Sequence, residues 1–239
     1  LAFEQDLAIL LGQNTEVFCH LMIPKVEDLA SLEKAITAIN SAGGHNIPIH
    51  VLIESAYAVH NAFAIASHPR VQSISFGLMD FVSSHGGAIG SQAMSSAGQF
   101  QHPMVLRAKL EIAAACHAYG KVPSHCVVTE FANEALLLSA AQQAAHQLSY
   151  QRMWSIHPKQ IKPILQAFAP QEQEIELACQ VIGAAALANW GPVSVDSKLH
   201  DRASFRYFWQ LIERAASVGQ VLPSSISKYF AVQTSHIST

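Results

Sequence analysis

Two carboxylate residues each follow an apolar run that has the composition of a buried strand. Glu54 directly follows residues 51–53, and Asp80 follows residues 76–79. If these runs are neighbouring parallel strands, their axes lie about 4.8 Å apart, so the two carboxylates can share one cation. Two carboxylates without a His or Cys beside them suit Mg²⁺, which keeps several of its waters. A structural interpretation accounts for both acids equally well: Glu54 caps the helix that follows it, and Asp80 accepts hydrogen bonds from loop amides.

Other strand ends carry groups that could bind an anionic substrate. Lys25 follows a proline at the end of the first apolar run. A buried lysine there could form a Schiff base, but Glu27 lies two residues further on and favours an ion-paired structural lysine. The segment Ile156-His157-Pro158 ends another apolar run and opens a helix, whose first backbone amides can receive an anion. A histidine beside a proline turn is also a common structural element.

The elements that must position these groups alternate along the chain, with a strand-like run followed by a helical one five times. The expected strands are 17–24, 47–53, 71–76, 122–128 and 152–156, and the expected helices are 27–39, 56–66, 103–119, 130–148 and a short one from 158. This order predicts an α/β fold with a parallel sheet and right-handed crossovers, in which ligands bind at the C-terminal ends of the strands. Periodicity alone does not separate a doubly wound sheet from a (β/α)8 barrel.

The pattern changes after residue 169. A helix is expected over 171–189, then a polar stretch without strand alternation to 200, then a helix over 201–217 and a loosely patterned tail over 219–239. We therefore predict a sheet domain over residues 1–169 and a helical C-terminal extension over residues 170–239.

Composition excludes several classes of protein. Hydrophobic residues make up 50% of the chain, charged residues 13%, and the formal charge is −3, which argues against nucleic acid or an anionic membrane as a partner. The four cysteines are scattered, so neither a disulfide framework nor a zinc ribbon is expected. The sequence lacks an apolar stretch of about 18 residues and the parts of a signal peptide. These features predict a cytoplasmic protein.

Five segments, in order, resemble the citrate lyase β-subunit/malyl-CoA lyase family of the HpcH/HpaI aldolase superfamily. They are residues 22–27, 52–55, 76–80, 155–161 and 195–201, and the resemblance extends to about residue 216. It implies a (β/α)8 TIM barrel with a C-terminal helical extension, assembled as a homotrimer or hexamer. The family's first three strands and a strand-end arginine have no counterpart here, so the resemblance also suggests a segment of a longer chain.

The resemblance implies roles for the residues already singled out. Glu54 and Asp80 correspond to the Mg²⁺ ligands, residues 156–158 correspond to a turn that contacts coenzyme A, and Lys25 is expected among the substrate-binding residues. The implied reaction is reversible cleavage of a 3-hydroxy acyl-CoA thioester, such as malyl-, citramalyl- or citryl-CoA, to a 2-oxo acid and acetyl-CoA. Asp201 matches the family's proton donor, which reaches in from a neighbouring subunit, although it also fits the cap of the last helix.

Three alternatives stay open at this stage. One is a class II aldolase that acts on a free 2-keto-4-hydroxy acid without coenzyme A. Another is a non-catalytic subunit of a lyase complex. An acyl-carrier protein could also take the place of coenzyme A as the thioester carrier.

Overall fold

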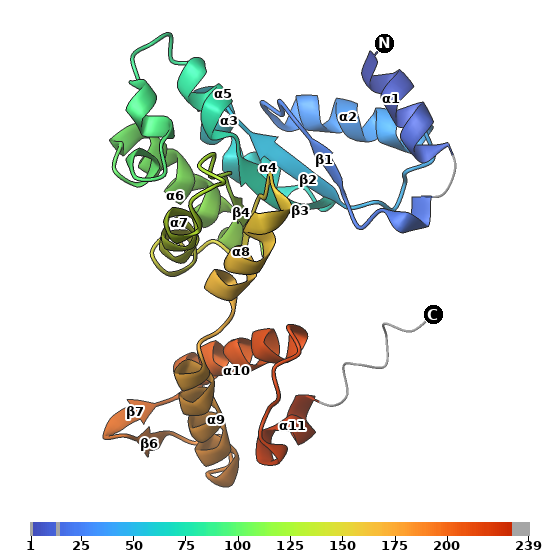
Figure 1. The fold of residues 1–239 in the computed structure, drawn as a ribbon. Coiled ribbons are helices and arrows are strands. Elements are labelled where there is room, and N and C mark those ends of the chain that lie inside the picture. The colour runs from blue at the N-terminus through green and yellow to red at the C-terminus, as the bar shows by residue number, and fades with distance from the viewer. Residues whose placement is uncertain (1, 13–14, 231–239) are drawn as a thin grey trace. The chain divides into compact units, whose positions relative to one another are not determined.

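The computed structural model describes residues 2–12 and 15–230 (Figure 1). The chain divides into two compact units, residues 1–168 and 169–239. None of the helices in these described ranges has both the length and the hydrophobicity that a bilayer-spanning helix requires.

The first unit is built on a five-stranded parallel sheet in the order β1-β2-β3-β4-β5. The strands are β1 (Leu21–Ile23), β2 (Ile49–Ile53), β3 (Val71–Phe76), β4 (Val122–His125) and β5 (Arg152–Met153). The predicted α/β fold with a parallel sheet is confirmed. Closure into an eight-stranded barrel stays a prediction.

Eight α-helices and four short 3₁₀ turns accompany this sheet in the described residues. The helices are α1 (Ala2–Leu11), α2 (Leu29–Ser41), α3 (Ala56–His60), α4 (Ala62–Ser67), α5 (Leu78–Ser83), α6 (Pro103–Ala118), α7 (Glu134–His146) and α8 (Ile161–Phe168). The turns are η1 (Thr15–Val17), η2 (Ser91–Met94), η3 (Gly98–Phe100) and η4 (Pro158–Gln160).

Local signals explain where several of these helices begin and end. Asp28 forms a capping box with Ser31 at the start of α2, and Ser55 caps α3 through the N–H of Ala58. Pro103 opens α6, and Gly120 follows the end of that helix with φ +64°, which a residue without Cβ adopts at little cost.

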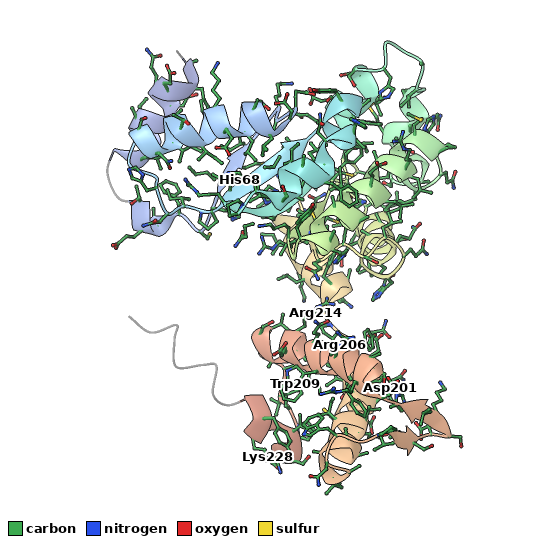
Figure 2. All side chains as sticks on the ribbon, turned by 180° about the vertical axis from the view of Figure 1, so that it is seen from behind. His68, Asp201, Arg206, Trp209, Arg214 and Lys228 are labelled. Atoms are coloured by element: carbon green, nitrogen blue, oxygen red, sulfur yellow. The ribbon has the colours of Figure 1, made fainter. Side chains whose placement is uncertain are left out.

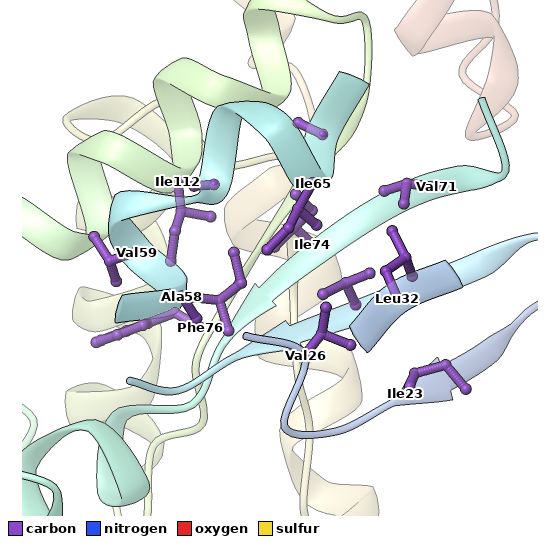
Figure 3. Packing of buried hydrophobic residues seen from close by; sticks show 14 of the residues in the cluster. Ile23, Val26, Leu32, Ala58, Val59, Ile65, Val71, Ile74, Phe76 and Ile112 are labelled. Atoms are coloured by element: carbon purple, nitrogen blue, oxygen red, sulfur yellow. The ribbon is translucent and has the colours of Figure 1, made fainter. Parts of the chain in front are cut away.

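The main hydrophobic core lies between the sheet and its helices. Figure 3 shows Ile74 and Phe76 of β3 beside Ile65 of α4 and Ile112 of α6, and all four side chains are fully buried. Burial of each such side chain stabilises the fold by roughly 1.5–3 kcal/mol. Strands β2 and β3 pair in parallel beneath this core, so their C-terminal ends lie side by side.

Some expected elements are shorter or interrupted. The run 17–24 contributes strand only at Leu21–Ile23, because Thr15–Val17 forms a 3₁₀ turn. The expected helix over 56–66 breaks at Asn61, whose amide donates to the carbonyls of Tyr57 and Glu27 and so ties the chain to the loop after β1. Strands β4 and β5 are also shorter than expected.

The second unit contains α9 (Glu172–Leu187), α10 (Arg202–Ser217) and α11 (Ser224–Phe230), together with a hairpin of β6 (Val193–Val195) and β7 (Lys198–His200). The expectation of a polar stretch without strands was therefore wrong. Asp196 and Ser197 both adopt positive φ values, 49° and 62°, and close the two-residue turn typical of antiparallel hairpins. The part of the expected tail beyond residue 230 lies outside the described residues.

Candidate metal and substrate site

Neighbouring strands bring Glu54 and Asp80 to the same edge of the sheet. Ile53 is in register with Phe76, and Gly77 donates its backbone N–H to the carbonyl of Ile53 at 2.7 Å. Glu54 is the next residue after β2, and Asp80 lies in the first turn of α5, directly after β3 and Gly77.

Gly77 leaves the room that the Glu54 side chain occupies. A Cβ atom at position 77 would lie 2.6 Å from Cβ of Glu54 and 2.9 Å from its Oε2. Any other residue at that position would push the Glu54 carboxylate away, because real Cβ contacts are not that short. The glycine in the predicted motif is thus a packing requirement of the acid.

Lys25 completes the cluster from the end of the neighbouring strand β1. Its backbone N–H donates to Glu54 Oε1 at 2.8 Å, and its ammonium donates to Asp80 Oδ1 at 3.2 Å. Lys25 has φ +54°, a left-handed conformation that costs a non-glycine residue on the order of 1 kcal/mol. That conformation directs the backbone N–H at the carboxylate of Glu54.

The two carboxylates have different surroundings. Glu54 is buried, with 7% of its surface exposed, whereas the side chains of Asp80 and Lys25 are 54% and 71% exposed. Burial raises the pKa of Glu54, the N–H of Lys25 opposes this shift, and the charge of Asp80 adds to it. The hydrogen bond to Asp80 is the main cause of the raised pKa of Lys25.

This arrangement fits a hard divalent cation. The donors are carboxylate oxygens, which Mg²⁺ prefers, and the Lys25 ammonium already occupies a cation position beside Asp80. Burial is the main cause of the raised pKa of Glu54, and a cation would relieve the smaller contribution that comes from the charge of Asp80. In the described ranges, no group of three or more His, Cys, Asp or Glu side chains is placed to bind one metal ion. Two protein ligands leave most positions of an octahedral ion to water and substrate.

The turn at Ile156-His157-Pro158 lies in the same unit, after β5. His157 accepts the N–H of Lys159 through Nδ1 at 3.2 Å, and its ring stacks on Phe131 with centroids 5.2 Å apart. Ile156 and Phe131 are about half exposed, at 50% and 52%. The turn therefore presents an aromatic pair and an aliphatic side chain to solvent.

Gln160 is a residue that the sequence analysis missed. Its side chain is fully buried; Oε1 accepts the N–H of Ile156 at 2.9 Å, and Nε2 donates to the carbonyl of Val128 at 2.8 Å. Gln160 thereby ties the turn to the end of β4. The Ile156 N–H is already engaged, so it is not among the amides that are free for an anion. No local signal marks this glutamine, because its partner Val128 is 32 residues away.

Asp201 belongs to the second unit and caps α10. Its Oδ1 accepts the N–H of Ala203 at 3.0 Å and that of Ser204 at 3.5 Å, while the Ser204 hydroxyl accepts the N–H of Asp201 at 3.0 Å. The capping interpretation left open from the sequence is therefore realised. The predicted role of Asp201 as a proton donor is compatible with it and stays a prediction.

Known proteins resemble this chain in sequence and in fold. The model of the HpcH/HpaI aldolase/citrate lyase family matches residues 2–158. The L-malyl-CoA/beta-methylmalyl-CoA lyase of Rhodobacter capsulatus is 30% identical over 235 residues, which span 91% of this chain and 73% of that protein. The lyase of the same name from Cereibacter sphaeroides is 28% identical, over 90% of this chain and 72% of its own length.

Solved structures agree with this relationship. A citrate lyase from Burkholderia xenovorans LB400 superposes with a TM-score of 0.86 at 41% identity, over 94% of this chain and 72% of that one. The protein CitE from Mycobacterium tuberculosis, solved with magnesium, acetoacetate and coenzyme A, has a TM-score of 0.67 at 20% identity, over 84% and 69% of the two chains, and shares the fold. The chain belongs to the HpcH/HpaI aldolase/citrate lyase family, a family of lyases and aldolases.

Proposed function

We propose that the chain is a magnesium-dependent carbon–carbon lyase that cleaves or forms a 3-hydroxy acyl-CoA thioester, yielding a 2-oxo acid and acetyl-CoA. The observation that carries the proposal is the convergence of Glu54, Asp80 and Lys25 at the ends of three neighbouring parallel strands. The relatives named as malyl-CoA lyases support the substrate class.

Glu54 and Asp80 are the residues that would hold Mg²⁺. When bound, the ion would supply Lewis-acid polarisation of the carbonyl oxygen of the 2-oxo acid. Lys25 fixes the Glu54 carboxylate through its backbone N–H, and its exposed ammonium offers an anionic substrate a second cation at the same edge. Burial of Glu54 keeps one ligand rigid, while the exposed Asp80 stays accessible from solvent.

Two further parts of the chain act on the thioester side of the substrate. The turn Ile156-His157-Pro158 contacts coenzyme A through its exposed aliphatic and aromatic groups. Asp201, from a neighbouring copy in a homo-oligomer, protonates the acetyl-CoA enolate. Conversion of that enolate to acetyl-CoA requires a proton donor, and a positioned donor contributes about 10²–10⁴-fold to the rate.

Isothermal titration with Mg²⁺, pyruvate and a series of thioesters tests the substrate class. We expect malyl-, citramalyl- or citryl-CoA to bind and to release acetyl-CoA, or β-methylmalyl-CoA to bind and to release propionyl-CoA. The preferred thioester identifies the substrate. Binding of pyruvate with Mg²⁺ but of no thioester would indicate an aldolase that acts on a free 2-keto-4-hydroxy acid. Thioester binding without turnover would indicate a non-catalytic subunit.

Substitution of Asp201 separates its two roles. Asn caps a helix as well as Asp, so Asp201→Asn is expected to preserve stability within about 0.5 kcal/mol while turnover falls about 10²–10⁴-fold. Asp201→Ala is expected to lose about 1 kcal/mol of stability as well. Thermal unfolding and acetyl-CoA release measure the two effects, and full turnover in the Asn variant would remove Asp201 from the mechanism.

A further inference from the structure

The second unit contains a pocket that none of the roles above uses. It has a volume of about 700 Å³, within the range of roughly 300–1,000 Å³ typical of small-molecule sites. Its walls combine aromatic rings with guanidinium groups, and we call it the Trp–Arg pocket. The residues that line it are Trp190, Arg202, Phe205, Arg206, Trp209, Gln210 and Glu213. All of them lie in residues 169–239, so the pocket is complete within one unit. Figure 2 labels Arg206 and Trp209 on α10.

The aromatic walls of the Trp–Arg pocket are held in place. Trp190 lies 6.1 Å from Trp209 and 6.3 Å from Phe205 between ring centroids, and it is 44% exposed. Asn189 and Trp190 both adopt left-handed backbone angles, with φ values of 52° and 61°, which turn the chain after α9. The indole N–H of Trp209 donates to Glu213 at 2.9 Å and fixes that ring. The pocket is thus formed before any ligand arrives.

Two guanidinium groups supply positive charge at one end of the pocket. Arg202 and Arg206 are one helical turn apart on α10, and both are exposed. Neither has a hydrogen bond or an ion pair with any residue in the part of the chain that the structure describes. Glu213, about two turns beyond Arg206, places one carboxylate at the far end. The pocket therefore has a cationic end, an aromatic middle and an acceptor at the opposite end.

We infer that the Trp–Arg pocket is a ligand site for an anionic molecule with a planar aromatic ring, of the nucleotide class. Arginine binds phosphate groups bidentately, and tryptophan faces stack on planar rings and cations. Glu213 can accept a hydrogen bond from an exocyclic amino group of a base. The nucleotide can be free in solution, or it can be the nucleotide end of coenzyme A.

Tryptophan and arginine are also enriched in protein interfaces. The volume of the pocket favours a small molecule over a flat protein contact. Sedimentation of the variants described next distinguishes the two occupants.

The test is isothermal titration of the full chain with ADP, adenosine, inorganic pyrophosphate and coenzyme A, without Mg²⁺ or a 2-oxo acid. We expect ADP to bind more tightly than adenosine or pyrophosphate, because it combines ring and charge. Arg206→Gln is expected to weaken ADP binding about tenfold or more, since one charge-assisted pair is lost. The matched control is Arg214→Gln, on the same helix and outside the pocket lining, which is expected to bind as the parent does.

The outcomes separate the sources of the nucleotide. If coenzyme A displaces ADP and depends on Arg206, the pocket takes the nucleotide end of coenzyme A; if it does not displace ADP, the ligand is a free nucleotide. The inference is overturned if neither ADP nor coenzyme A binds, or if Arg206→Gln binds both as tightly as the parent. A change of sedimentation in Arg206→Gln without any nucleotide binding would assign the surface to a subunit contact. Because turnover is not measured, either result leaves the proposed lyase activity untouched.

Discussion

Two lysines of the first unit have opposite surroundings. Lys25, at the strand ends, is exposed and pairs with the carboxylate of Asp80. Lys109, on α6, is fully buried; its ammonium donates to Gln99 Oε1 at 2.7 Å and lies 4.1 Å from the centroid of the Phe100 ring. The pKa of Lys25 is raised, chiefly by the hydrogen bond to Asp80, whereas burial lowers the pKa of Lys109 to about 8.

The partners of each lysine explain this difference. Around Lys109 the Cys126 thiol donates to the same Gln99 oxygen at 3.1 Å, and the Tyr150 hydroxyl donates to the Lys109 carbonyl at 3.0 Å. These groups are neutral, so the ammonium loses its hydration without gaining an opposite charge. At the solvent-exposed edge of the sheet, Lys25 and Asp80 carry opposite charges and remain accessible to a ligand. In the core, the Lys109 ammonium is surrounded by neutral polar groups, and its side chain fills space between the packed elements.

The largest expected effect is on the exposed cluster. Asp80→Asn is expected to lower lyase turnover and Mg²⁺ affinity at least about a hundredfold, because one of two charged metal ligands is lost. Acetyl-CoA release and magnesium titration measure both. Glu111→Gln, which removes a carboxylate from a surface ion pair with Arg107, is the control and is expected to keep both. If Asp80→Asn retains full activity, the cluster is a structural ion pair and the metal assignment is wrong.

The buried lysine is expected to affect stability. Lys109→Ala leaves a cavity beside Phe100 and lowers the free energy of unfolding by about 2–4 kcal/mol. Lys109→Met keeps most of the volume and removes the desolvated amine, and Gln99 keeps the Cys126 thiol as a donor. That variant is expected to be as stable as the parent or more so. Urea unfolding at pH 7 compares the three proteins, and equal losses in both variants would show that the ammonium itself stabilises the core.

Alkaline pH sharpens the comparison between the two lysines. Between pH 8 and 10.5 the Lys109 amine is protonated in the unfolded chain and deprotonated in the folded chain. The contribution of Lys109 to the free energy of unfolding therefore rises with pH. Across this pH range the free energy of unfolding changes by about 3 kcal/mol through Lys109, since one pKa unit corresponds to about 1.4 kcal/mol. Burial raises the pKa values of Cys126 and Tyr150, which act in the opposite direction. The measurement is therefore the difference between parent and Lys109→Met in urea at pH 7.5 and 9.5, and an unchanged difference contradicts the assignment.

The smallest effect is expected at the exposed lysine. Lys25→Gln removes the ion pair with Asp80 but keeps the backbone N–H that binds Glu54. Solvent screens an exposed pair, so the free energy of unfolding should stay close to that of the parent. Thermal unfolding at low and high salt checks this, since a surface pair weakens with salt. A loss as large as that of Lys109→Ala would mean that this end of the sheet is held together by its charges.

The sequence by itself determined the elements whose signals are local. Strand β3 lies where the apolar run 71–76 predicted it, and α6 begins at Pro103 as predicted. The approach of Glu54 and Asp80 also followed from sequence, because the C-terminal ends of neighbouring parallel strands meet at one edge. Helix boundaries at proline and glycine depend on residues close in the chain. The pairing of successive parallel strands follows from the alternation of strands and helices, so both features could be predicted.

Only the tertiary structure decided the features that depend on distant residues. A single lysine within an alanine-rich helix gave no sign of burial; Lys109 is enclosed because Gln99, Cys126 and Tyr150 fold around it from other elements. The link of Gln160 to Val128 spans 32 residues. The hairpin at 193–200 is a local element and was missed for another reason: its turn places positive φ values on Asp196 and Ser197 rather than on a glycine. Apolar periodicity and turn residues are properties of a segment, whereas burial and hydrogen-bond partners are properties of the assembled chain.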